Sequence, residues 1–86
     1  KFGSLHLNIL HAQWDQFGVK KHEFISLQLG QEKIATPFVE TFGDVAPGQP
    51  LLLKDDYGRV EVALNLGSFT EQYAVAVGDR CIISKL

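Results

Sequence analysis

The sequence predicts a mostly β protein, a small β-barrel of about six short strands with one or two short helices. Two observations carry this prediction. Strand-like segments recur about every ten residues, separated by Gly and Pro, and apolar and polar residues alternate within several of them. The length of 86 residues is enough for one domain with one core, so residues 1–86 are assigned to a single domain.

The first strand is predicted from strict alternation. Residues 5–9 read Leu-His-Leu-Asn-Ile, so one side of the segment is apolar and the other polar, as in a half-buried strand. Residues 11–21 are mixed and indicate a loop or one helical turn. Trp14 and Phe17 are three residues apart, so a short helix would bury both side chains on one face.

Two hairpins are predicted next. Residues 24–29 and 33–36 form the first, with a Gly-Gln turn between them and an interruption at Pro37. Residues 51–53 are three consecutive leucines, which is typical of a central strand, and residues 60–64 form its hairpin partner.

The last part of the chain predicts a capped helix, a turn and a strand. Ser68 is expected to cap a short helix, with Glu71 three residues later completing a capping box. Gly78 and Asp79 predict a turn before the final strand, residues 80–84.

Composition limits the partners and the compartment. The net charge of −2 gives no electrostatic reason to expect nucleic acid or an anionic membrane, and no apolar stretch reaches the roughly 20 residues of a membrane span. Cys81 is the single cysteine, which favours a cytoplasmic location and a small, buried structural side chain. The chain begins at Lys1 and has no methionine, so we expect a domain excised from a larger protein.

No catalytic or metal-binding signature is found. The three histidines have no zinc-ligand spacing, and His6 is expected to be an exposed strand residue. Asp55 and Asp56 are adjacent in a predicted turn, where turn chemistry is favoured over calcium binding or catalysis. The sequence therefore predicts no catalytic residue and no metal site in this chain.

Aromatic residues in loops are the first indication of a ligand. Phe2, Phe42 and Tyr57 are each followed by glycine. A flat ligand could therefore stack on the ring while the glycine backbone approaches the ligand closely. Alternatively, these rings fill the ends of a barrel. Asn65 and Leu66 lie between a predicted strand and a predicted helix, where free backbone N–H groups can meet a polar ligand or simply form a turn.

Four segments together resemble a known family, and they run across nearly the whole chain in the family's order. Residues 2–9, 41–53, 57–67 and 77–80 are similar to the "F-G-N-L-x-T-N-I", "T-[YF]-x-D-V-x-x-G", "G-x-L-E-I-A-x-N-x-G" and "x-G-D-x-V" patterns. These patterns belong to the C-terminal domain of the S-adenosylmethionine hydroxide adenosyltransferases, also called S-adenosylmethionine hydrolases. The fluorinases and chlorinases share that domain.

The resemblance implies a C-terminal β-barrel domain that follows an N-terminal α/β domain in a homotrimeric enzyme. In such enzymes water, or a halide, attacks C5′ of S-adenosylmethionine and releases methionine and adenosine or a halo-deoxyadenosine. The ligand lies between the N-terminal domain of one subunit and the C-terminal domain of its neighbour. The catalytic groups belong to the N-terminal domain, and S-adenosylmethionine is the substrate, with no further cofactor.

The resemblance also implies substrate-binding residues. Phe2 and Phe42 would border the adenine, and Ser4 stands where the family has an adenine-binding Asn. Backbone groups of Asn65 and Leu66 would read the adenine as well. Asp56 and Tyr57 stand where the family has Ser followed by Arg or an aromatic residue, near the methionine carboxylate.

Two alternatives remain open. Residues 67–69 and 75–80 resemble the helix and turn of PDZ-type domains, which bind peptide C-termini by strand addition. The other alternative is a purely structural assembly domain, in which the loop aromatics form a subunit interface.

Overall fold

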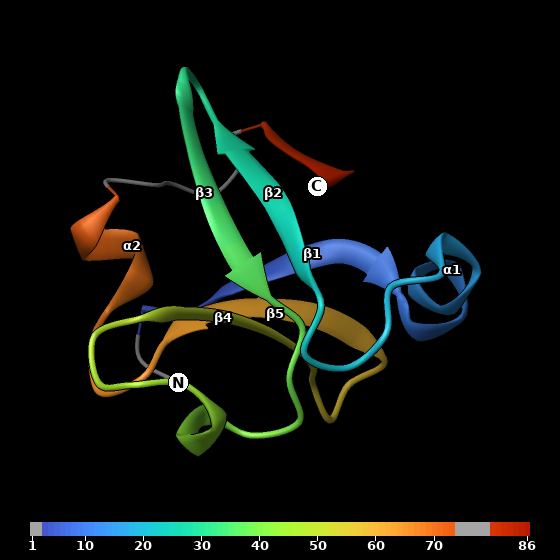
Figure 1. Ribbon diagram of the computed structural model, residues 1–86, viewed down its shortest axis with the longest axis horizontal. Coiled ribbons are helices and arrows are strands. Elements are labelled where there is room, and N and C mark those ends of the chain that lie inside the picture. Colours follow the sequence, from blue (N-terminus) through green and yellow to red (C-terminus); the bar gives the residue numbers. More distant parts are fainter. Residues whose placement is uncertain (1–2, 74–79) are drawn as a thin grey trace.

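The computed structural model describes residues 3–73 and 80–86. Six strands in these ranges form two three-stranded antiparallel sheets, in the orders β1-β5-β4 and β3-β2-β6 (Figure 1). The elements in chain order are β1 (Leu5–Leu10), α1 (His11–Phe17), β2 (Phe24–Leu29), β3 (Glu32–Pro37), the 3-10 turn η1 (Phe42–Asp44), β4 (Pro50–Lys54), β5 (Arg59–Leu64), α2 (Phe69–Gln72) and β6 (Cys81–Lys85).

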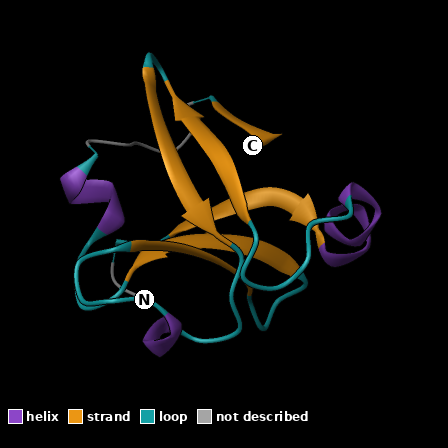
Figure 2. Ribbon diagram, in the orientation of Figure 1, coloured by secondary structure: helices purple, strands orange, loops and turns teal. Residues whose placement is uncertain are grey.

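The predicted mostly β class with two short α-helices is confirmed (Figure 2). The predicted barrel is not confirmed, because strand pairing within the described ranges gives two separate sheets. The connection between them is a parallel bridge between Phe38, just beyond β3, and Leu52 of β4. The two sheets therefore pack as layers around a shared core.

The predicted hairpins are confirmed with small shifts at their ends. β2 and β3 are paired along their whole length, with Phe24 opposite Pro37 at one end and Leu29 opposite Glu32 at the other. The expected turn joins them. Pro37 ends β3 instead of lying outside it, because β3 is an edge strand of its sheet, where a missing N–H need not break the ladder. β4 and β5 form the second predicted hairpin, and the predicted Gly78–Asp79 turn lies outside the described residues.

The main core lies between the two sheets and is closed by the helices. Trp14 of α1 is 2% exposed and its ring contacts Phe38 edge-on, with centroids 5.2 Å apart. Phe69 of α2 is fully buried and contacts Tyr73. The prediction that a short helix buries Trp14 is confirmed, and Phe17 packs partly buried against the same core. Cys81 also packs partly buried there, and burial raises the pKa of its thiol to about 11.

A second, smaller core explains the three leucines of β4. The sequence predicts a central strand for them, but β4 lies at the edge of its sheet and β5 is central. Leu52 faces the main core, whereas Leu51 and Leu53 face the opposite side, where Val39 and Ala63 join them. The three leucines of β4 are all buried because the chain segment between β3 and β4 covers its outer face.

The start of β1 is held against α2. The carbonyl oxygen of Gly3 accepts a hydrogen bond from the Thr70 N–H at 2.8 Å. Ser68 caps α2 as predicted, since its Oγ accepts from the Glu71 N–H at 3.3 Å. Within the described part of the chain, no helix has the length and apolar character that crossing a bilayer requires.

We predict that Gly3→Ala destabilises the protein more than Gly30→Ala. Both glycines have positive φ, 77° and 60°, so each substitution costs about 1–2 kcal/mol for the left-handed backbone. A Cβ on Gly3 would also overlap Ser68 Oγ, whereas a Cβ on Gly30 meets nothing within 4 Å. Thermal unfolding of the two variants measures the difference. Equal losses of stability would contradict the packing of Gly3 against α2.

Candidate functional site

The candidate site is built around the outer face of the sheet β1-β5-β4, and the predicted ligand-binding residues that the structure describes lie toward its two ends. Along β5 the side chains alternate: Val60, Val62 and Leu64 enter the main core, so Arg59, Glu61 and Ala63 face outward. Pairing places His6 of β1 and Leu53 of β4 on either side of Glu61. The outer face is therefore apolar toward Ala63 and polar toward Arg59.

The apolar end is covered by the segment between β3 and β4. Phe42 and Val45 pack against the second core. The side-chain amide of Asn65 donates to the Val45 carbonyl oxygen at 2.8 Å, and the Gly48 N–H donates to the Asn65 carbonyl oxygen at 2.6 Å. These bonds fix the covering segment to the end of β5.

The turn that carries Phe42 is shaped by Asp44. Its Oδ2 accepts hydrogen bonds from the backbone N–H groups of Glu40 and Thr41, each at 3.2 Å. The bonds from Thr41 and then Glu40 are the main reasons that the pKa of Asp44 is lowered. The Thr-Phe-Gly-Asp pattern thus holds the half-buried Phe42 ring in place.

Ser4 lies at the same end of the sheet as Phe42 and Asn65. Leu5 pairs with Val62, so Ser4 stands beside Ala63 on the outer face. The Ser4 Oγ is buried and finds no hydrogen-bond partner among the described residues. Three predicted site residues, Ser4, Phe42 and Asn65, therefore lie at the same end of the sheet, while Phe2 lies outside the described residues.

The Asn65–Leu66 pair is arranged differently from the prediction of free backbone groups. The Asn65 N–H donates to the Gln49 carbonyl oxygen, so its amide and its N–H are both engaged within the chain. Leu66 has a φ of 58° and its side chain is 83% exposed. Of the two, Leu66 is the residue that the turn presents to solvent.

Asp56 and Tyr57 lie away from this group. They form the turn between β4 and β5, so the six residues of β5 separate them from Asn65. At about 3.3 Å per residue, this distance is about 20 Å. The predicted site residues therefore form two groups at opposite ends of one strand.

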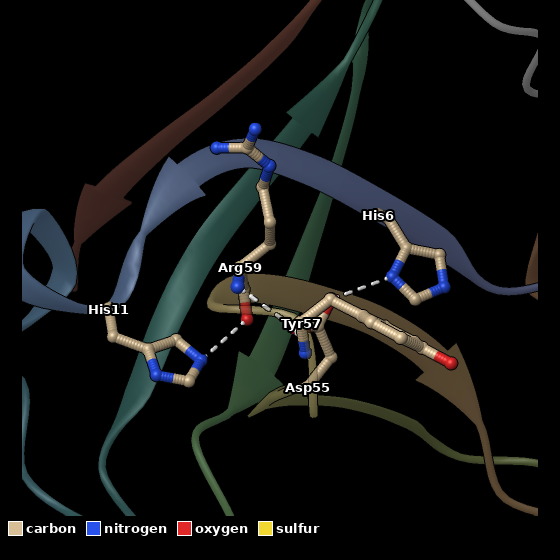
Figure 3. Close-up of polar contacts among 5 residues, drawn as sticks. All are labelled: His6, His11, Asp55, Tyr57 and Arg59. Atoms are coloured by element: carbon tan, nitrogen blue, oxygen red, sulfur yellow. Dashed lines mark hydrogen bonds and ion pairs between the residues drawn. The ribbon is translucent and has the colours of Figure 1, made fainter.

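At the polar end, a buried carboxylate organises the turn (Figure 3). The Asp55 Oδ1 accepts from the backbone N–H groups of Tyr57 and Arg59, both at 2.8 Å, and its Oδ2 lies 2.8 Å from Nδ1 of His6. Burial raises the pKa of Asp55, but the bonds from Arg59, His6 and Tyr57 together outweigh burial, and the net pKa is lowered.

The His6–Asp55 contact is the feature of the candidate site that the sequence did not predict. Turn chemistry was correctly expected for Asp55, and His6 is indeed about half exposed, with 49% of its side chain accessible. The two residues are 49 positions apart, and only the register of β1 on β5 brings them together. They line a pocket of about 420 Å³ with Leu7, Asn8, Tyr57 and Arg59.

Comparison with known proteins places the chain in a family. The family model of the SAM hydroxide adenosyltransferase C-terminal domain matches residues 1–82. A relative from Salinispora tropica, named (R)-S-adenosyl-L-methionine hydrolase, is 50% identical over 42 residues, which are 49% of this chain and 16% of the relative.

Two solved structures share the fold. An uncharacterized conserved protein from Thermotoga maritima has a TM-score of 0.92 and 28% identity, over 96% of this chain and 32% of that protein. A conserved hypothetical protein from Thermus thermophilus has a TM-score of 0.64 and 24% identity, over 96% and 29% of the two chains.

The fold and the two groups of site residues define a small two-sheet β domain with a candidate ligand-binding face. The chain belongs to the SAM hydroxide adenosyltransferase C-terminal domain family. It spans about a third or less of the length of the relatives that it matches.

We predict that Asp55→Asn lowers the free energy of unfolding at neutral pH by about 1–3 kcal/mol, because hydrogen bonds to a charged, buried acceptor are weakened. The pKa of Asp55 is lower in the folded protein than the ordinary 3.8. The stabilisation by the charged Asp55 carboxylate is therefore present above pH 3.8, the ordinary pKa of the group. It is lost as the pH falls through the lower pKa of the folded protein.

Urea unfolding at neutral pH and in acid measures this effect. The difference between the wild type and Asp55→Asn should shrink in acid. Asp56→Asn is the matched control, since Asp56 is exposed and should change stability little at either pH. A similar loss in both variants would show that the Asp55 contacts do not stabilise the turn.

Proposed function

We propose that this domain is the nucleoside-binding part of an enzyme that cleaves S-adenosylmethionine. The observation that carries the proposal is the family match over residues 1–82. The name of the Salinispora tropica relative supports the hydrolase activity. The separation of the site residues into two groups also fits a long ligand, with a purine at one end and an amino acid at the other.

The purine would bind at the end of the sheet near Ala63. Phe42 is half-buried and anchored by its turn, so its ring offers a fixed surface for stacking, which is worth about 1–3 kcal/mol per base. The Ser4 Oγ, which has no hydrogen-bond partner in residues 3–73 and 80–86, can donate to or accept from the purine edge. Phe2 is proposed to border the same purine, and the backbone of Leu66 to read its edge, as the family resemblance implies.

The amino-acid end would lie near the turn that carries Asp56 and Tyr57. The Tyr57 side chain is 86% exposed and lines the polar pocket. Asp56 is exposed in the same turn, where its carboxylate would suit the ammonium or sulfonium of the ligand better than it would suit the ligand's carboxylate.

The reaction is a displacement at C5′. The oxygen of water forms a bond to C5′ while the bond from C5′ to sulfur breaks, and sulfur keeps the electron pair as the neutral thioether of methionine. The attacking water loses a proton, so adenosine is released; a halide nucleophile would give halo-deoxyadenosine instead. We place the groups that activate the nucleophile in an N-terminal α/β domain, outside this chain.

A shared site between subunits follows from the same proposal. In a homotrimer in the cytoplasm, this domain would bind the ligand against the N-terminal domain of a neighbouring subunit. The candidate face suits such sharing because it is the outside of a sheet, and its polar end is open to a covering surface. The domain would then supply binding and orientation, and its neighbour would supply the chemistry.

We predict that the full-length protein releases methionine from S-adenosylmethionine. Incubation with the substrate, followed by chromatographic detection of methionine and adenosine in equal amounts, tests this activity. Added chloride or fluoride would divert the product to halo-deoxyadenosine if a halide is the nucleophile. A full-length, folded protein that binds adenosine but releases no methionine would contradict the proposed reaction.

We predict that Phe42→Ala in the full-length protein removes most adenosine binding while the protein remains folded. Loss of stacking weakens affinity by about 10-fold to 100-fold. Phe42→Leu is the matched control, since it keeps apolar contacts with the second core and removes only the aromatic ring. Calorimetry should show weak binding by both variants, and unchanged affinity would exclude Phe42 from the site.

A further inference from the structure

Asn65 holds the segment that covers the apolar end of the sheet with its side chain and with both of its backbone groups. Its side-chain amide donates to the Val45 carbonyl oxygen at 2.8 Å, and its N–H donates to the Gln49 carbonyl oxygen at 3.1 Å. Its own carbonyl oxygen accepts from the Gly48 N–H at 2.6 Å. Three hydrogen bonds from one residue therefore join the end of β5 to the segment between β3 and β4.

The bond from Asn65 to Val45 continues to the backbone of Phe42. The Val45 carbonyl oxygen accepts from the Asn65 amide, while the Val45 N–H donates to the Phe42 carbonyl oxygen at 3.4 Å. The side chains of Phe42 and Val45 both pack against the second core. Asp44 holds the start of this turn from within, so the Asn65 amide supplies a connection from the turn to the sheet.

Asn65 also precedes the residue that the next turn presents to solvent. Leu66 has a φ of 58°, which is unfavourable for a residue with a Cβ, so the surrounding bonds must hold it in this conformation. The backbone bonds of Asn65 with Gln49 and Gly48 fix the chain directly before Leu66. Asn65 thus stands between the Phe42 ring and the Leu66 backbone, the two groups proposed to contact the purine.

We propose that Asn65 is a positioning residue, which holds the Phe42 ring and the Leu66 backbone in place for the purine without contacting it. The proposal rests on the proposed function, because it requires a purine at this end of the sheet. The family resemblance implies that backbone groups of Asn65 read the adenine, but its N–H and its carbonyl oxygen are already bonded within the chain. Contacts that are ordered before binding raise affinity, because the ligand does not have to order them.

The adenosine affinity of full-length variants tests the proposal. Asn65→Asp keeps the size of the side chain but replaces the amide donor with a carboxylate, and Asn65→Ala removes the donor without adding charge. Each variant should weaken adenosine binding by about 2-fold to 10-fold. Gln31→Glu is the matched control, since it adds the same charge in the exposed turn between β2 and β3 and should leave the affinity unchanged.

A double-mutant cycle with Phe42 separates positioning from a general loss of stability. In the Phe42→Leu background the aromatic ring is already absent, so Asn65→Ala should reduce adenosine affinity by a smaller factor than it does in the wild type. An equal reduction in both backgrounds would overturn the positioning role, because Asn65 would then act independently of the ring.

Amide hydrogen exchange gives a readout that does not depend on the ligand. Asn65→Ala should speed exchange of the Val45 and Gly48 N–H groups, whereas amides that pair β2 with β3 should keep their wild-type exchange rates. Unchanged exchange at Val45 and Gly48 would overturn the proposal, because the segment would then not depend on the Asn65 amide.

The outcomes also distinguish this inference from the proposed function. If the wild-type protein binds no adenosine, the proposed function fails and the positioning role fails with it, whatever the exchange rates. If the wild type binds adenosine and Asn65→Ala binds it equally tightly, the domain binds nucleosides and only the role of Asn65 is overturned. Weaker binding that depends on the Phe42 ring, together with faster exchange at Val45, supports the proposal.

Discussion

β5 occupies the middle of its sheet and pairs with β1 on one side and β4 on the other. Its alternation sends Val60, Val62 and Leu64 into the main core, and this burial fixes the direction of Arg59, Glu61 and Ala63. A slip of one residue would turn the valines and the leucine away from the main core and point Arg59, Glu61 and Ala63 into it. The register that stabilises the fold is thus the same register that assembles the candidate site.

Local patterns predicted most of this fold because they depend on neighbours in the chain. Alternation indicated β1, Gly and Pro marked the hairpins, and Ser68 marked the start of α2. The predicted central position of β4 was wrong because a continuous apolar run indicates only that both faces of the strand are buried. A central strand is covered by neighbouring layers, whereas β4 is covered by Val39, Phe42 and Val45 from a loop, which no local pattern reveals.

The candidate site was predictable to the extent that its residues belong to sequence motifs. The Thr-Phe-Gly-Asp segment points to Phe42, and the structure adds the reason, since Asp44 bonds to the backbone that carries this ring. The contact of His6 with Asp55 has no such motif. It depends on the pairing of β1 with β5, which brings together two residues 49 positions apart, and a single sequence does not disclose that pairing.

The same geometry limits what this domain can do by itself. Its candidate site is a sheet face with one covered end and one open end, where Tyr57 is largely exposed and His6 is about half exposed. Charged contacts made in such an open place are weakened by water, whereas the same contacts gain strength when a second surface excludes it. A displacement at carbon also requires a nucleophile held in line with the leaving sulfur, which a single face cannot provide. The open face is therefore consistent with the proposed function, in which this domain would bind the ligand and a facing domain would enclose the reacting centre.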